Sequence, residues 1–149
     1  PLRDVYKRQD PDVAWDKVRR SSRRISDVLL DQRVAAGVGN IYRAEVLFRH
    51  RVDPATLGKQ ISHSTWLAMW DDLVMLMRAG VESGRIDTVQ PEHTPEAMGR
   101  PPRVDRHGGE VYVYRREDQP CLVCNTPVRM VAQGGRHLFW CPRCQRRRH

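Results

Sequence analysis

Four cysteines near the end of this 149-residue chain have the residue type and the spacing of a metal site. Cys121 and Cys124 are separated by two residues, Cys141 and Cys144 by two more, and sixteen residues lie between the pairs. Each Cys-X-X-Cys turn directs two thiolates toward one point, and two such turns joined by a hairpin complete a tetrahedron around Zn²⁺. Because four thiolates leave no open coordination position, we expect this zinc to be structural.

Two other chemistries use cysteine pairs. Two disulfides would require an exported protein, yet the start of the chain lacks the apolar core of a signal peptide. A redox Cys-X-X-Cys would lie on a helix that follows a strand, whereas here two pairs flank a hairpin. No run approaches the roughly 20 apolar residues of a membrane span. The sequence therefore favours zinc and predicts a soluble, cytoplasmic protein without membrane contacts.

The positive charge of the chain is concentrated at the same end as the cysteines. The net charge is +8, and residues 100–149 hold 11 basic against 4 acidic side chains, while residues 1–99 hold 15 against 14. Gly134 and Gly135 predict a tight hairpin turn, with Arg136 directly beyond it at the tip. Such a cationic end fits a polyanion, because guanidinium groups bind phosphates with two parallel hydrogen bonds.

A second candidate phosphate contact is the glycine turn Gly37-Val38-Gly39-Asn40, which precedes a predicted helix. Glycines let backbone N–H groups approach an oxygen ligand closely, and the N-terminus of a helix carries a partial positive charge. The turn lacks the Gly-Lys-Ser/Thr of a Walker loop and the preceding strand of a dinucleotide site. Alone it also fits an ordinary connection between helices, whereas beside a basic zinc hairpin it indicates phosphate binding.

Helices must position this turn, and apolar periodicity predicts four of them. Asp10 and Pro11 begin the first helix, and the second begins near Ser26 and continues to the glycine turn. Asn40 is expected to be the N-cap of the third helix, at 41–50. The fourth runs from Ser62 to about Ser83, where Gly84 ends it.

Composition divides the chain further. Four prolines interrupt residues 85–109, which predicts a linker, and β-branched and aromatic residues at 110–115 predict a strand. The expected units are a non-native or disordered leader at 1–9, a helical domain at 10–84, the proline-rich linker at 85–109, a four-cysteine zinc finger at 110–146 and a basic tail at 147–149.

Two motifs carry a family resemblance. Residues 30–48, LDQRVAAGVGNIYRAEVLF, resemble the helix-two-turn-helix motif of the formamidopyrimidine-DNA glycosylase/endonuclease VIII family. Residues 108–114, both cysteine pairs and residues 135–145 resemble its C-terminal zinc finger, and the endonuclease VIII branch is the most similar. The resemblance implies a mostly α fold with a small β zinc module: a helix-two-turn-helix bundle followed by a four-cysteine zinc-ribbon hairpin.

The resemblance also implies a function and a set of DNA contacts. The family excises oxidised bases from DNA and cleaves the backbone at abasic sites, as bifunctional N-glycosylase/AP lyases of base-excision repair. Gly39 and Asn40 match the glycine turn that holds the phosphate beside the lesion, and Arg136 matches the arginine that grips phosphates flanking the flipped nucleotide. The expected partner is damaged or abasic duplex DNA, bound by a monomer associated with the bacterial nucleoid, with Zn²⁺ as the cofactor.

The catalytic residues of the family are not matched. Its nucleophile is an N-terminal proline, which is followed by a glutamate and lies on a β-sandwich domain. Here Leu2 follows Pro1, and Asn40 comes too early for a β-sandwich to precede the helices. We therefore expect no catalytic residue in this chain and no activity from it alone, because the catalytic domain is missing.

Two alternative functions stay open. One is a stand-alone zinc-dependent DNA-binding module. The other is a zinc-ribbon RNA-binding protein, since ribosomal proteins also combine basic ribbons with a related helical turn. Preference for an abasic duplex over structured RNA would separate the glycosylase interpretation from the second alternative.

Overall fold

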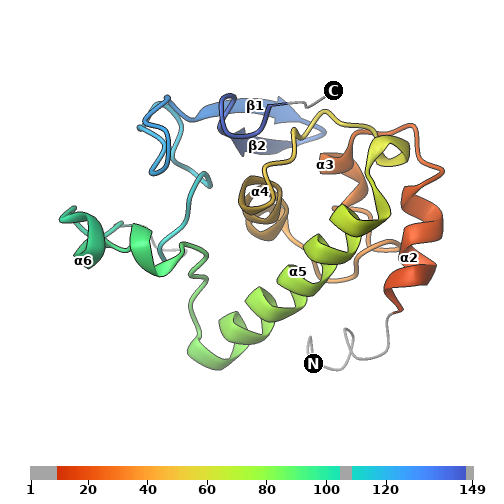
Figure 1. Cartoon of the computed structure of the whole chain (residues 1–149), viewed down its shortest axis with the longest axis horizontal. Helices are drawn as coiled ribbons and strands as arrows, with labels where there is room; N and C mark the ends of the chain where they lie inside the picture. Colours follow the sequence, from red (N-terminus) through yellow and green to blue (C-terminus); the bar gives the residue numbers. More distant parts are fainter. Residues whose placement is uncertain (1–9, 105–108, 147–149) are drawn as a thin grey trace.

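The computed structural model describes residues 10–104 and 109–146, so the expected leader and basic tail lie outside the described residues. Within them the fold is mostly helical, with a two-stranded antiparallel sheet near the C-terminus (Figure 1). The predicted fold class is confirmed. In chain order the elements are α2 (Pro11–Val18), α3 (Ile25–Val28), α4 (Asn40–Arg49), η1 (Gly58–Gln60), α5 (His63–Ser83), η2 (Pro91–His93), α6 (Pro95–Met98), β1 (Arg129–Gln133) and β2 (Arg136–Trp140).

Helix α5 is the longest element and begins and ends where the sequence predicts. The Ser62 hydroxyl accepts a hydrogen bond from the Thr65 amide at 3.2 Å, and Gly84 ends the helix with a φ of 73°. A stripe on one face packs into the helical core, and Trp66 donates from its indole to the Pro11 carbonyl of α2 at 3.1 Å. The buried residues of α5 are Trp66, Met69, Trp70, Leu73, Leu76 and Met77.

The second predicted helix is much shorter than expected, because side chains take over its backbone hydrogen bonds. After α3, the Asp31 carboxylate accepts from the Arg33 amide at 3.0 Å, and the Gln32 side chain accepts from the Gly37 amide at 2.7 Å. Such local bonds compete with helical ones. Gly37 has a φ of 84°, which a side chain would disfavour. The chain therefore crosses from α3 to α4 in turns.

Helix α4 connects the two halves of the molecule. Val46 and Leu47 face the core formed by α2, α3 and α5, whereas Ala44 and Phe48 face a second core, formed with residues from Val111 to Cys141. The N-cap of α4 is Gly39 and no side chain caps it, so the prediction that Asn40 is the N-cap was wrong. The Asn40 side chain instead bonds to the Arg43 side chain and to the His137 carbonyl.

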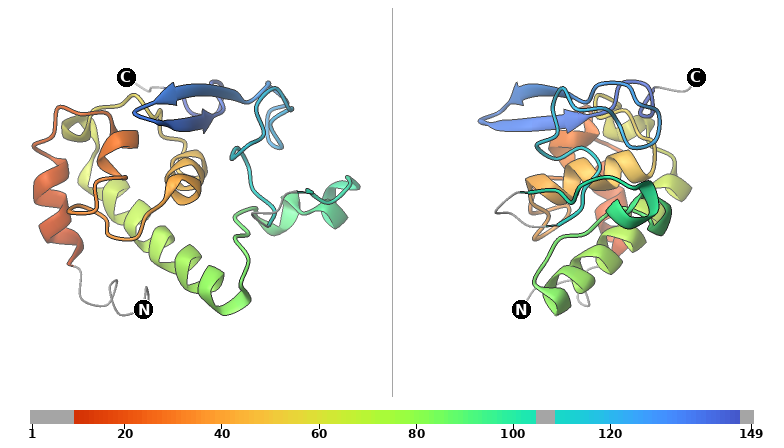
Figure 2. Two further views of the ribbon diagram at one scale, coloured as in Figure 1. Left: turned by 180° about the vertical axis from the view of Figure 1, so that it is seen from behind. Right: turned by 90° about the vertical axis from the view of Figure 1, so that its left-hand side faces the viewer.

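The hairpin β1–β2 lies over α3 and α4, at the opposite side of α4 from most of α5 (Figures 1 and 2). Its turn is Gly134-Gly135, with φ values of 57° and 79°, as the sequence predicts. The register pairs Gln133 with Arg136 and Arg129 with Trp140. Arg136 therefore begins β2 directly after the turn.

Residues 110–115 are not a strand, contrary to the prediction. Three successive amides, those of Tyr112, Val113 and Tyr114, donate to the buried Glu45 carboxylate at 2.6–3.0 Å. The Glu45 carboxylate thus supplies the hydrogen-bond acceptors that a neighbouring strand would supply in a sheet. The described part of the preceding linker is ordered into η2 and α6, and no described helix is long and apolar enough to cross a membrane.

Candidate nucleic-acid interface

The four cysteines meet as the sequence predicts. Their sulfur atoms all lie within 4.8 Å of one another. The distance is 3.9 Å between the Sγ atoms of Cys121 and Cys144, and 3.4 Å between those of Cys124 and Cys141. A tetrahedral ion with Zn–S bonds of about 2.3 Å separates its sulfurs by roughly 3.8 Å. The cluster therefore has the size of a Zn²⁺ site.

In each cysteine turn, a backbone amide approaches the sulfur of the first cysteine. The Val123 amide approaches the sulfur of Cys121 at 3.5 Å, and the Cys144 amide approaches that of Cys141 at 3.4 Å. Backbone N–H groups directed at sulfur stabilise thiolates. All four cysteines are free, so the disulfide alternative does not hold in this structure.

A buried glutamine joins the zinc module to the helices. Gln145 is 1% exposed; its Oε1 accepts from the Cys141 amide at 2.8 Å, and its Nε2 donates to the Val52 carbonyl at 3.0 Å. The second cysteine turn is thereby fixed to the segment that follows α4. Sequence analysis did not single out Gln145, because its partner is 93 positions away.

The N-terminus of α4 faces the hairpin. Asn40 Nδ2 donates to the His137 carbonyl of β2 at 2.8 Å, and Asn40 Oδ1 accepts from Arg43 Nε at 3.0 Å. The N–H groups of the first turn have no intrahelical acceptors, and no side chain caps them. A Cβ atom placed on Gly39 would meet nothing within 4 Å. The surface beside Gly39 is therefore open to a ligand.

Arg136 belongs to the same region. It is exposed, it precedes the residue that accepts from Asn40, and its charge contributes to lowering the pKa of Arg43. The structure thus brings together Gly39, Asn40 and Arg136, which sequence analysis selected from distant parts of the chain.

Two charged residues of α4 were missed. Arg43 and Glu45 are both 0% exposed, and both face partners outside the helix. Glu45 also accepts from the Thr88 hydroxyl at 2.5 Å. Both residues stand between apolar residues of the helix, and this could have indicated that they are buried. A charged residue on a helix is ordinarily expected to face solvent, so neither was selected.

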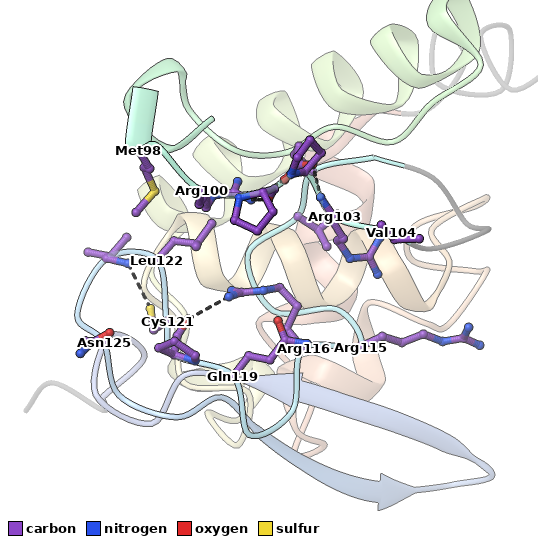
Figure 3. Close-up of a pocket in the computed structure, with 16 residues that line it drawn as sticks. Met98, Arg100, Arg103, Val104, Arg115, Arg116, Gln119, Cys121, Leu122 and Asn125 are labelled. Atoms are coloured by element: carbon purple, nitrogen blue, oxygen red, sulfur yellow. Dashed lines mark hydrogen bonds and ion pairs between the residues drawn. The ribbon is translucent and has the colours of Figure 1, made fainter. Parts of the chain in front are cut away.

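A cavity of about 610 Å³ lies elsewhere, between the linker and the first cysteine turn (Figure 3). None of its lining residues belongs to α4 or to the hairpin. Three of its four arginines are held internally: Arg100 pairs with Glu110 at 2.8 Å, and Arg103 and Arg116 donate to backbone carbonyl groups. The cavity therefore lies where the linker packs against the zinc module, away from the candidate phosphate contacts.

Comparison with known proteins agrees with this architecture. The formamidopyrimidine-DNA glycosylase H2TH domain matches residues 2–91, and the zinc finger found in FPG and IleRS matches residues 118–147. The chain is 45% identical over 139 residues to Endonuclease 8 1 of Mycobacterium tuberculosis, covering 91% of this chain and 49% of that protein. It is 35% identical over 134 residues to formamidopyrimidine-DNA glycosylase of Crocosphaera subtropica, covering 90% and 45%.

A solved structure shares the fold. The complex of Lactococcus lactis Fpg with DNA containing an abasic site aligns with a TM-score of 0.71 at 26% identity, over 93% of this chain and 48% of that one. The chain spans about half the length of the curated relatives it matches.

Fold and site together define a helix-two-turn-helix unit joined to a four-cysteine zinc finger. The chain belongs to the formamidopyrimidine-DNA glycosylase H2TH domain family. The predicted resemblance is thereby confirmed, and the zinc-finger match agrees with a structural zinc held by the four cysteines.

Proposed function

We propose that this chain is the DNA-binding part of a base-excision repair glycosylase/AP lyase and that it holds duplex DNA at a damaged or abasic site. The observation that carries the proposal is the Asn40–His137 hydrogen bond, which joins the uncapped N-terminus of α4 to the hairpin that bears Arg136. The uncapped amides of α4 and the Arg136 guanidinium are thus held beside each other. The names of the relatives and the abasic-site DNA in the Lactococcus lactis complex support the same function.

In this proposal the contacts read the DNA backbone. The amides of the first turn of α4 and the Asn40 side chain bind one phosphate, while Arg136 binds a neighbouring one. Rotating a nucleotide out of the duplex costs a few kcal/mol. Phosphate contacts on both sides of the distortion offset that cost without selecting the base. Zn²⁺, held by the four cysteines, fixes the hairpin and takes no part in the chemistry.

The domain division and the cellular setting are part of the proposal. The units are the helix-two-turn-helix domain at 10–84, the linker at 85–109 and the zinc finger at 110–146, with α4 contributing to both cores. The protein acts as a monomer on nucleoid DNA in the bacterial cytoplasm. The whole protein excises oxidised bases and cleaves at abasic sites, and the described residues supply its DNA binding.

Gly39→Ala gives the sharpest test. The backbone at Gly39 has φ −100° and ψ −175°, which alanine adopts freely, and the added Cβ meets no protein atom within 4 Å. The melting temperature should therefore change little. The Kd for a duplex with a tetrahydrofuran abasic analogue, measured by fluorescence anisotropy, should rise by about tenfold, because the methyl group occupies the approach of the phosphate.

Asn40→Ala and Arg136→Ala should weaken binding by a similar factor for every base at the lesion. Arg78→Ala, on the exposed face of α5, is the control and should leave the Kd unchanged. Unchanged affinity in Gly39→Ala, or altered base preference in Arg136→Ala, would refute the proposed contacts. Borohydride treatment with abasic DNA should give no covalent adduct; an adduct would show that the chain itself carries a lyase nucleophile.

A further inference from the structure

Arg43 is a buried cation without a carboxylate partner in the described part of the chain. The residue is 0% exposed and forms none of the ion pairs in that part. Its Nε donates to Asn40 Oδ1 at 3.0 Å and its Nη1 donates to the Ser26 carbonyl at 3.1 Å. Nη2 is buried and has no hydrogen-bond partner among the described residues.

This arrangement is costly for folding. A buried charge is ordinarily paired, and a buried donor without an acceptor destabilises the folded state by about 1–3 kcal/mol. Burial lowers the pKa of Arg43 to about 10, and the nearby charges of Arg136 and Arg24 act in the same direction, while Asp27 opposes them. The guanidinium nevertheless stays charged at neutral pH. This cost points to a role for Arg43 beyond stability.

The contacts of Asn40 show what Arg43 does. A guanidinium only donates hydrogen bonds, and a backbone carbonyl only accepts them. Arg43 Nε therefore requires the oxygen of the Asn40 amide, and the His137 carbonyl requires its nitrogen. If the amide were flipped, its nitrogen would face the donor Arg43 Nε and its oxygen would face the acceptor carbonyl of His137. The orientation of the Asn40 side chain is thus fixed from both ends.

One hydrogen of Asn40 is left over. Nδ2 carries two hydrogens, and the His137 carbonyl takes one of them. The second hydrogen has a fixed direction because the amide cannot rotate. Asn40 is the first residue of α4 and follows Gly39, beside which the surface is open.

We propose that Arg43 is a positioning residue of the phosphate site, which orients the Asn40 amide from behind. This inference rests on the proposed function. Arg43 touches no DNA in this scheme and acts through Asn40.

A purely structural role is the competing explanation, because the bond to Ser26 also ties α3 to α4. A double-mutant cycle separates the two. Kd values for the tetrahydrofuran duplex are measured at one salt concentration for Arg43→Met, Asn40→Ala and the double variant. We expect Arg43→Met to raise the Kd by at least tenfold in the natural background and by less than twofold beside Asn40→Ala.

Arg78→Met is the matched control, since it removes the same charge from an exposed position on α5. It should change the Kd by less than twofold. Arg43→Lys keeps the charge and one donor, so it should bind more tightly than Arg43→Met. If Arg43→Met does not fold, the same cycle can be measured with Arg43→Lys. An equal loss from Arg43→Met in both backgrounds would overturn the inference.

A measurement without DNA keeps this test independent of the proposed function. In the free protein the two side-chain N–H protons of Asn40 should have well-separated NMR signals, because one is hydrogen-bonded and the other is not. In Arg43→Met the pair should move toward the positions of an asparagine whose side chain rotates freely, and in Arg43→Lys the movement should be smaller. An unchanged pair would refute positioning by Arg43, whereas absence of DNA binding by the natural chain would refute only the proposed function.

Discussion

Asn40 and His137 are 97 positions apart in the chain, yet the side-chain amide of the first donates to the carbonyl oxygen of the second at 2.8 Å. The bond connects the first turn of α4 to the strand that follows the hairpin turn. The Ser26 hydroxyl of α3 also donates to Gln133 Oε1 of β1 at 3.2 Å, and Gln145 fixes the other end of the zinc module to Val52, in the segment after α4. The relative position of Arg136 and α4 is therefore set by hydrogen bonds and by the metal site together.

Asn40→Asp should separate stability from DNA binding. An aspartate keeps an oxygen for Arg43 Nε and gives that buried cation a counter-charge, and a negative charge in the first turn of a helix is favourable. We expect the melting temperature to change by only a few degrees, because the counter-charge beside Arg43 offsets the lost hydrogen bond to the His137 carbonyl. Affinity for the abasic-analogue duplex should fall by about a hundredfold, because a carboxylate repels the phosphate.

Calorimetry and anisotropy on the same samples check this pair of outcomes. Asn40→Ala is the reference, since it removes the amide without adding charge. If Asn40→Asp and Asn40→Ala bind equally well, then no phosphate approaches this side chain.

Removal of zinc should abolish DNA binding while most of the helical structure survives. The core of α2, α3 and α5 contains no residue of the zinc module, whereas the second core depends on Val128, Phe139 and Cys141. A module of this size takes much of its folding free energy from the metal. After dialysis against a chelator, the far-UV circular dichroism should keep most of its helical signal, and the anisotropy titration should show no specific binding.

Re-addition of one equivalent of Zn²⁺ is the control and should restore the original Kd. Full affinity in a sample shown by metal analysis to be free of zinc would contradict the role assigned to the four cysteines.

Local patterns predicted the parts of the fold that local interactions decide. The spacing of the cysteines, the turn at Gly134 and the end of α5 at Gly84 each depend on a few neighbouring residues. The strand expected at 110–115 failed for the opposite reason. Its β-branched and aromatic residues indicate extended backbone, but the acceptor for its amides is the carboxylate of Glu45, about 67 positions earlier in the chain.

The same limit applies to the site. Gly39, Asn40 and Arg136 were selectable because their motifs resemble a known family. Arg43 and Gln145 lie in the same motifs, but the motifs did not indicate their roles, which depend on the distant carbonyl or amide groups that fold against them.

Glu45→Gln should destabilise the protein strongly. The carboxylate accepts from three backbone amides and the Thr88 hydroxyl, and an amide group in its place would turn one acceptor into a donor that faces N–H groups. Leaving such buried donors unsatisfied costs about 3 kcal/mol in total. For a chain of this length the melting temperature should fall by roughly 6–12 °C.

Differential scanning calorimetry measures this loss, and Glu82→Gln on the exposed end of α5 serves as the control. A drop in melting temperature no larger than that of the control would mean that residues 110–115 do not depend on Glu45.

Acid should weaken the contact between α4 and α5 through Asp72. Burial alone raises the pKa of this carboxyl, but hydrogen bonds from His50 and Arg49, together with their charges, outweigh it and bring the pKa to about 2. Arg49 binds both carboxylate oxygens, at 2.8 and 3.0 Å. The unfolded value is about 3.9, so the folded state binds protons more weakly than the unfolded state. The stabilisation is therefore complete above about pH 5 and is lost as the pH falls toward 2.

Allowing for partial screening by solvent, this contribution amounts to about 1–2 kcal/mol. Urea unfolding at intervals between pH 2 and pH 6 measures it as a decline in the free energy of unfolding across that window. In Asp72→Asn the carboxyl is absent, so the decline should be smaller by the same amount and the stability at pH 6 should be lower. Parallel curves for the natural chain and Asp72→Asn would show that Arg49 and His50 do not stabilise the charged form of Asp72.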